Sequence, residues 1–296
     1  MPGYLNNIQK FREKYHISDV TEEDLNHLAG LNNQIKPFIL RRKKQDVIKD
    51  LPDKIENNIY LDLPESQKKL YVSVLKETEE EIEEIIATKG FAASRFKILQ
   101  LLTKLRQICI NPNVLYENYE GESIKTEKII EMIKDYVKEQ HKILIFSSFK
   151  KVLDLLKEEL TKSKISFYSI DGSVKGSERL PLIDKFNEDK TSCFLLTLKS
   201  GGTGLNLTSA DIVIHLDIWW NPQAENQATD RAHRIGQTKK VIVNKLITKG
   251  TIEERILELQ KKKRILSENL IEGNASSSLE TLTEEDLKNL LTYSNE

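Results

Sequence analysis

The chain has 296 residues, 39% of them hydrophobic, which is enough apolar material for the core of one large domain or two smaller ones. Its 45 basic and 46 acidic side chains nearly cancel, so the composition excludes a uniformly basic nucleic-acid binder, and any DNA surface must come from local clustering. No apolar run approaches the roughly 18 residues of a membrane span, and the two cysteines, Cys109 and Cys193, are too few and too far apart for a zinc site or a disulfide framework. We therefore expect a folded protein of a reducing, cytoplasmic or nuclear compartment, with no metal site and no membrane as partner.

Residues 1–50 and 51–125 are predicted to be a connector and a helical insertion. The connector ends in the basic run Arg41-Arg42-Lys43-Lys44, which is followed by a Leu51-Pro52 break. In the second segment, a short alternating stretch over residues 55–63 gives way to long helical patterning, with apolar side chains on one face over residues 96–108. We expect the glutamate run over residues 77–84 to be a solvated helix face.

Residues 126–249 alternate between helical and strand patterns. Short apolar strands separated by helices of about ten residues are typical of a parallel sheet with helices on both faces. Such a sheet binds ligands in the loops beyond the carboxyl ends of its strands, which here are the loops after Leu198 and around Trp219. The predicted strands cover 143–146, 165–170, 193–198, 212–215 and 241–247, and the predicted helices cover 128–138, 152–160, 180–186 and a segment from about 223.

Residues 250–296 are predicted to be a long helix and a tail. Thr251-Ile252-Glu253-Glu254 is a capping-box pattern, and the helix that it begins is expected to run to about residue 271. A polar break over residues 273–278 precedes a short amphipathic helix over 283–291.

A glycine-rich segment follows the predicted strand 193–198 directly. Its glycines let backbone amides approach a phosphate or a ribose closely, and its lysine adds positive charge. A tight strand-to-helix turn is the alternative interpretation, because such loops are common. The segment reads Lys199-Ser200-Gly201-Gly202-Thr203-Gly204.

Gln227, Arg231 and Arg234 are spaced i, i+4 and i+7 on a predicted helix, so all three are expected to point the same way. Two arginines and a glutamine on one face, beside Asp230, indicate an anion clamp, because the planar guanidinium bonds phosphate oxygens in a bidentate manner. A surface salt-bridge face is the alternative.

The two tryptophans of the chain are adjacent, in Trp219-Trp220-Asn221-Pro222. An exposed indole beside a positive loop would stack on nucleic acid or wedge into a groove. The alternative is that one or both indoles pack in the core. We expect Trp220 to be the nucleic-acid contact.

Several of these segments together resemble the motor of SWI/SNF-type translocases, which are superfamily-two helicase-like ATPases. DIWWNPQAENQATDRAHRIGQ resembles motif VI of that family, LTLKSGGTGLNL motif V, ILIFSSF motif IV and IDGSVKGSER the motif between the last two. Upstream, IKPFILRRKKQDVIKDLP resembles the segment that joins the two motor lobes, and GTIEERILELQKKK resembles the helix that braces the second lobe. The motifs stand in family order over roughly residues 1–270.

The resemblance implies a RecA-like C-terminal lobe, with a helical insertion and a bracing helix, that works with an N-terminal ATPase lobe. Arg234 matches the arginine finger, Arg231 a companion that contacts phosphate, and Gln227 a glutamine linking the nucleotide to the lobe interface. Two further groups are carried over from the family: Gly202, Gly204 and Asn206 near the nucleotide, and Ser147, Ser148, Lys199, Ser200, Gly201 and Trp220 facing DNA.

The resemblance also implies ATP with Mg²⁺ as cofactor, double-stranded DNA as partner and a DNA-bound protein as the object of remodelling. No Gly-Lys dipeptide and no Asp-Glu dipeptide occurs, so the phosphate cradle and Mg²⁺-binding carboxylates of the first lobe are absent from these residues. We expect the chain to be inactive alone, and to be a truncated chain, a split gene or a fragmentary reading frame. Two alternatives are the second lobe of an RNA helicase and a non-catalytic DNA- or protein-binding module.

Overall fold

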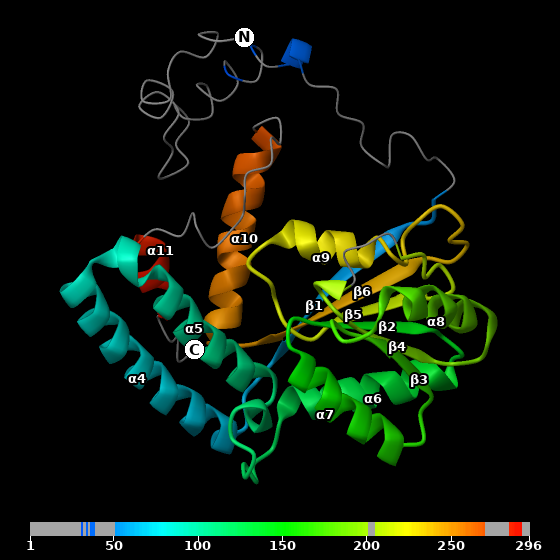
Figure 1. Cartoon of the computed structure of the whole chain (residues 1–296), viewed down its shortest axis with the longest axis horizontal. Helices are drawn as coiled ribbons and strands as arrows, with labels where there is room; N and C mark the ends of the chain where they lie inside the picture. Colours follow the sequence, from blue (N-terminus) through cyan, green and yellow to red (C-terminus); the bar gives the residue numbers. More distant parts are fainter. Residues whose placement is uncertain are drawn as a thin grey trace.

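A computed structural model of the chain describes residues 31, 34, 36–38, 51–200, 205–269 and 284–291. Within these residues, six parallel strands form one sheet in the order β1-β6-β5-β2-β4-β3 (Figure 1). This arrangement confirms the predicted α/β class. The strands are β1 Lys54–Leu61, β2 Ile143–Ser147, β3 Phe167–Ile170, β4 Cys193–Thr197, β5 Ile212–His215 and β6 Val241–Thr248.

Helices cover both faces of the sheet, because alternate side chains of the central strands are apolar and point to opposite sides. Ile143 and Ile145 of β2 pack with α6 (Ile124–Lys138) and α7 (Lys150–Lys162). Leu144 and Phe146 pack with α8 (Gly176–Glu188) and α9 (Pro222–Thr229) on the other face. All five residues of β2 are buried, as expected for a central strand covered on both sides.

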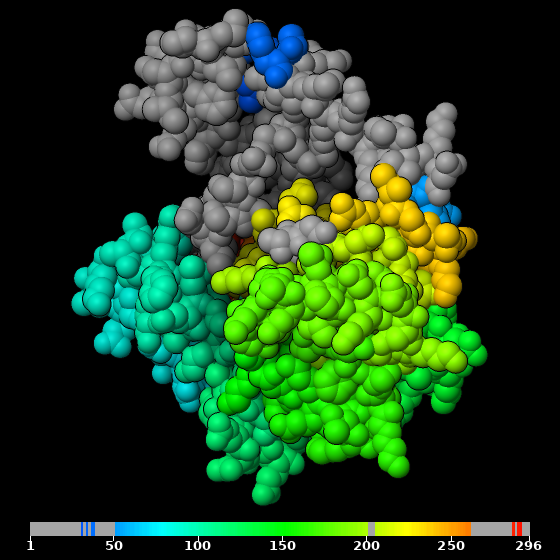
Figure 2. All heavy atoms as spheres, turned by 45° about the vertical axis from the view of Figure 1, so that its right-hand side comes forward, coloured from blue at the N-terminus to red at the C-terminus, as the bar shows by residue number. Residues whose placement is uncertain are grey.

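A helical hairpin of α4 (Glu65–Lys89) and α5 (Phe91–Ile110) lies beside the sheet (Figure 1). The hairpin turns at Gly90, whose φ of 75° lies in the left-handed region that favours glycine. Its core also includes side chains of α10 (Ile252–Asn269) and α11 (Glu284–Leu291), so the predicted bracing helix packs against the insertion. In Figure 2 the hairpin lies at the side of the sheet domain and adjoins it. Short 3-10 helices cover Lys36–Phe38 and Pro112–Val114.

The edge strand β1 is the main difference from the predicted organisation, which placed residues 51–125 together as a helical insertion. All eight residues of β1 pair in parallel with β6, from Lys54 opposite Val241 to Leu61 opposite Thr248. The partner strand lies about two thirds of the chain away, and local periodicity carries no information on such pairing. The insertion in the structure is therefore the α4–α5 hairpin, and the sheet begins before it.

Three segments discussed above lie outside the described residues: the basic run 41–44, glycines 201, 202 and 204, and the break 273–278. No helix in the part of the chain that the structure describes is long and apolar enough to cross a membrane.

Candidate functional site

Strands β2, β4 and β5 end side by side, and the loops that follow them carry most of the residues predicted to face DNA. The loops are held together by backbone hydrogen bonds, from Leu198 N to Ser147 O at 3.0 Å and from Leu216 N to Phe146 O at 2.9 Å. The structure thus brings residues 147–148, 199–200 and 217–220 to one carboxyl edge of the sheet, where ligands of such sheets bind.

The loop after β2 is tied down by a buried carboxylate, Asp217. One oxygen of Asp217 accepts hydrogen bonds from Ser147 Oγ at 2.9 Å and from the Ser148 amide at 2.8 Å. Ser147 is fully buried, so its hydroxyl serves the fold, and the expectation that it faces DNA is wrong. Ser148 stays partly exposed at the edge.

Lys199 and Ser200 are adjacent but point in opposite directions. Lys199 is exposed, whereas Ser200 is buried and its Oγ donates to Ile170 O at 2.9 Å. The Ser200 hydroxyl also lies 2.7 Å from the Thr197 hydroxyl. The DNA-facing role expected of the Ser200 side chain is therefore wrong, and Lys199 is the side chain of this pair that reaches solvent.

Trp220 is 7% exposed and belongs to the core beneath the helical hairpin. Burying an indole removes a large apolar area from water, and this favours the interior position. The expectation of an exposed Trp220 that contacts nucleic acid is wrong, and the core-packing alternative holds. Trp219 is partly buried and lies between the two cores that flank it. The motif continues into α9, where Asn221 Oδ1 accepts the Gln223 amide at 2.8 Å as an N-cap.

The predicted single helix face of Gln227, Arg231 and Arg234 is also wrong, because α9 ends at Thr229. The backbone continues in tight turns, in which Arg231 N donates to Ala228 O at 3.1 Å. The carbonyl of Arg231 accepts from Leu207 N at 3.0 Å, so it does not bond a later helical amide. Gln227 therefore lies on the helix, and the two arginines lie on the turn after it, which we call the arginine turn (residues 230–237).

The two guanidiniums of the arginine turn are near enough to influence each other. The pKa of Arg231 is lowered, first by partial burial and then by repulsion from Arg234, while Asp230 opposes the shift. Arg234 and Gln227 are exposed. Two cationic forks near the surface form a donor set that suits a polyanion such as a nucleotide phosphate.

Two side chains that the sequence analysis did not single out hold the arginine turn in place. Gln237 Nε2 donates to Ala210 O at 2.8 Å and to Ala232 O at 3.2 Å, while its Oε1 accepts from the amides of Thr238 and Lys239. His233 Nε2 lies 2.8 Å from Pro52 O, where the chain enters β1. Both polar residues lie within three positions of Arg234 in the sequence, and this proximity is the signal by which they could have been predicted to support the arginines.

Asn206, the last of the predicted nucleotide-side residues, is exposed, and its carbonyl accepts from Asn187 Nδ2 at 2.9 Å. Its neighbours Gly202 and Gly204, together with Gly201 on the DNA side, lie outside the described residues. Within the described ranges, no group of three or more His, Cys, Asp or Glu side chains is arranged to hold a metal ion.

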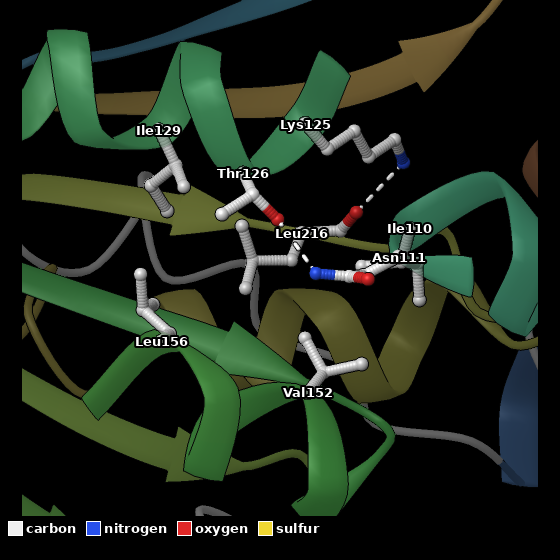
Figure 3. A pocket seen from close by; sticks show the side chains of 8 residues that line it. All are labelled: Ile110, Asn111, Lys125, Thr126, Ile129, Val152, Leu156 and Leu216. Atoms are coloured by element: carbon white, nitrogen blue, oxygen red, sulfur yellow. Dashed lines mark hydrogen bonds between the residues drawn. The ribbon is translucent and has the colours of Figure 1, made fainter. Parts of the chain in front are cut away.

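A buried ion pair joins the helical elements to the sheet behind the site. Lys125 Nζ lies 2.6 Å from Glu253 Oε1 and donates to the carbonyls of Leu216 and Leu246, each at 2.7 Å. The lysine borders a small pocket under α6 and α7, where Asn111 donates to Thr126 at 3.0 Å (Figure 3). This pocket has room for about one water molecule. Its polar side chains all have hydrogen-bond partners within the protein, so it is not a candidate ligand site.

Two protein-family models match the chain. One, described as the helicase conserved C-terminal domain, covers residues 124–236, and the other, described as the SNF2-related domain, covers residues 1–114. The boundary between them falls after α5, and the first model includes β2 to β5 and the arginine turn through Gly236.

Curated relatives and solved structures agree with these matches. An "Uncharacterized ATP-dependent helicase" of Mycoplasma pneumoniae is 40% identical over 98% of this chain and 27% of its own length. The "Putative ATP-dependent helicase/translocase YwqA" of Bacillus subtilis is 35% identical over 99% of this chain and 32% of its own length. The chain thus spans about a third or less of the curated relatives it matches.

Two solved structures from Sulfolobus solfataricus are similar to the fold. The SWI2/SNF2 ATPase C-terminal domain matches with a TM-score of 0.65 and 32% identity, over 82% of this chain and all of that one. The SWI2/SNF2 ATPase core in complex with dsDNA matches with a TM-score of 0.67 and 33% identity, over 99% of this chain and 62% of that one.

Proposed function

The chain belongs to the SWI2/SNF2 family of ATP-dependent helicases, and we propose that it is the C-terminal motor lobe of a double-stranded DNA translocase that remodels protein–DNA complexes. Its RecA-like α/β sheet provides two surfaces for that work: the carboxyl edge with Ser148 and Lys199, and the arginine turn. The observation that carries the proposal is that Ser148 and Lys199 lie together at this edge, while Leu207, which follows Lys199 closely in the sequence, donates its amide to the Arg231 carbonyl of the arginine turn.

At the arginine turn, we propose that Arg231 and Arg234 contact the phosphates of ATP and that Gln227 lies at the lobe interface. The transferring phosphoryl group carries negative charge on its oxygens, and a guanidinium placed there lowers the barrier. The exposure of Arg234 and its proximity to Arg231 fit this role. Gly202, Gly204 and Asn206 are proposed to lie near the ribose or the phosphates, and Gly201 to face DNA.

At the carboxyl edge, Lys199 and the partly exposed Ser148 are the side chains proposed to contact the DNA backbone. These groups suit phosphates and not base edges, so binding should be weak, sensitive to salt and indifferent to sequence. Ser147, Ser200 and Trp220 support the edge from inside.

ATP hydrolysis is proposed to need an N-terminal ATPase lobe as partner. These 296 residues include arginines for the phosphates, but no Gly-Lys dipeptide of a phosphate cradle and no Asp-Glu pair for Mg²⁺. Most contacts to ATP and Mg²⁺ would then come from the partner lobe. A DNA-bound protein is the proposed object of remodelling, and the complex would reside on the nucleoid of a bacterium or in a nucleus.

The test measures ATPase activity and duplex binding together. We expect no phosphate release from the chain alone, with or without DNA, and DNA-stimulated release when an N-terminal SNF2 lobe is joined to it. Weak binding of a short duplex at low salt should disappear near physiological salt. ATP hydrolysis by the chain alone, or duplex binding that is unaffected by salt, would contradict the proposal.

A further inference from the structure

Arg106 of α5 is a buried cation that neither the family motifs nor the proposed contacts use. Its side chain is 1% exposed, yet it reaches from the helical hairpin into the loops at the carboxyl edge of the sheet. Its Nη2 donates to Asp217 Oδ2 at 2.8 Å and to Ile218 O at 2.9 Å, and lies 3.4 Å from Ser148 Oγ.

Three aromatic rings surround the Arg106 guanidinium. Its central carbon lies 4.9 Å from the ring centroid of Trp219, 5.6 Å from that of Trp220 and 5.1 Å from that of Phe149. A planar, weakly hydrated guanidinium is suited to such a position, because it stacks on rings while its edge makes hydrogen bonds. Arg106 therefore contacts the loop after β2 and the loop after β5 at once, from a third element.

The same contacts lead to the groups at the surface of the edge. Asp217 accepts from Arg106 on one oxygen, and its other oxygen accepts from Ser147 and from the Ser148 amide. Ser147 O in turn accepts the amide of Leu198, the residue before Lys199. These hydrogen bonds thus join the buried cation to Ser148 and to the backbone of Leu198, which precedes Lys199.

We propose that Arg106 is a positioning residue for the DNA-facing edge, which holds the loops after β2 and β5 against α5 and so sets where Ser148 and Lys199 meet duplex DNA. This inference rests on the proposed function. It makes the α4–α5 hairpin part of the DNA site, although the guanidinium itself does not touch DNA. A shift of the hairpin would displace Ser148 and Lys199 at the edge, whereas a rigid hairpin would hold them in position before DNA binds.

The experiment uses the 296-residue chain, a short fluorescent duplex at low salt and three variants. Arg106→Lys keeps the charge and loses the planar stack, whereas Arg106→Met keeps an apolar stem and leaves Asp217 buried without its cation. The double variant Arg106→Met/Asp217→Asn removes both charges, which protects the fold because an uncompensated buried charge is the main source of instability in such pairs. Leu101→Ala, on the same helix and in the hairpin core, is the control for stability alone.

Two readouts are combined with thermal unfolding. Trp219 and Trp220 are the two tryptophans of the chain, so intrinsic tryptophan fluorescence reports on the Arg106 site without a label. Duplex affinity reports on the edge. Both are measured at a temperature at which every variant is folded.

We expect the duplex affinity of the double variant to fall roughly 3- to 30-fold, the range of coupling known for residues that act through others. Its melting temperature should lie close to that of Leu101→Ala or above it, and its tryptophan emission should be red-shifted. Arg106→Lys should keep more affinity than Arg106→Met. Leu101→Ala should keep the parent affinity and emission.

The positioning role is overturned if the double variant binds the duplex as tightly as the parent, or if Met at position 106 preserves affinity better than Lys. The second result would identify the side chain as packing only. Failure of the parent chain to bind any duplex at low salt would overturn the DNA-binding proposal and this inference with it, whereas either of the first two results overturns the positioning role alone.

Discussion

The carboxyl edge of the sheet and the arginine turn both carry residues that match family motifs, yet they differ in how much water reaches them. At the edge, Ser147, Ser200 and Trp220 are buried, and both serine hydroxyls bond groups inside the protein. At the turn, Arg234 is exposed, as is Gln227 on the helix before it.

This difference separates two kinds of motif residue. A buried polar group must find partners within the protein, because an unsatisfied one costs about 1–3 kcal/mol. The buried edge residues Ser147, Ser200 and Trp220 therefore act as a scaffold, and their loss should first reduce stability. At the arginine turn, Gln237 holds the backbone while the Arg234 side chain is exposed, so loss of Arg234 should first reduce activity under the proposed function.

The largest effect is expected from Arg234→Ala in a protein that contains both motor lobes. DNA-stimulated ATP turnover should fall by roughly 10³-fold or more, about 4 kcal/mol of barrier, because the charge on the transferring phosphoryl group loses its guanidinium. Apparent ATP affinity and the melting temperature should change little. Arg234→Lys should rescue poorly, because an ammonium lacks the planar fork. A large drop in melting temperature would instead support the salt-bridge alternative for this residue.

Trp220→Ala should have its main effect on stability, in contrast to Arg234→Ala, which should mainly affect activity. Removal of a buried indole from the hairpin core should lower the free energy of unfolding by roughly 3 kcal/mol or more, as measured by urea titration. Gln227→Ala, on the exposed surface of α9, is the control and should leave stability within about 0.5 kcal/mol of the parent. A Trp220→Ala protein with unchanged stability and lost duplex binding would show that the indole acts at the surface after all.

Acid should destabilise the chain through His215, at the end of β5. Burial, helped by the nearby charge of Lys245, lowers the pKa of His215 from 6.5 to about 3. The unfolded chain takes up this proton below pH 6.5 and the folded chain does not, so this contribution to stability is complete above pH 6.5 and declines as pH falls toward 3. The slope should be about 1.4 kcal/mol per pH unit in urea titrations. His215→Gln should remove that slope, and an unchanged slope would exclude His215 as its source.

The smallest expected effect separates the neighbours Lys199 and Ser200. Lys199→Ala should reduce the slope of log affinity against log salt for duplex binding by about 1, because one phosphate contact is lost. Ser200→Ala should leave that slope unchanged and lower stability by about 1 kcal/mol. Lys190→Ala is the matched control, since this exposed lysine precedes β4 and lies toward the opposite edge of the sheet. Equal effects of the two lysines would argue against a DNA contact at Lys199.

Much of the fold could be predicted from the sequence. The five strands expected between residues 126 and 249 are all present, and the helices on either side of them match the predicted pattern. Apolar side chains recur with a period near two in strands and near 3.6 in helices, so the pattern itself records which face is buried. The family motifs also pointed to the loops that the structure brings together at the carboxyl edge of the sheet.

The remaining features depend on contacts between distant parts of the chain. The pairing of β1 with β6 joins segments 187 residues apart. α9 ends at Thr229, and beyond it the Arg231 carbonyl accepts a hydrogen bond from the distant Leu207. Neither the β1–β6 pairing nor the Leu207–Arg231 hydrogen bond has a local signal in the sequence, because the residues next to each partner do not indicate which distant segment it will contact.

The sequence by itself therefore determined the α/β class, the order of the strands and helices between residues 126 and 229, the family and the two loops where function is proposed. These follow from periodicity and from motifs, which are local properties of the chain. Only the tertiary structure decided which motif side chains face inward and which face water. Arg106 of α5 and the pair Asp217 and Trp220 of the loop after β5 lie far apart in the sequence, and they contact each other only after the chain has folded. Burial depends on these tertiary contacts. The buried residues support the site, and under the proposed function the exposed Arg234 and Lys199 contact its ligands.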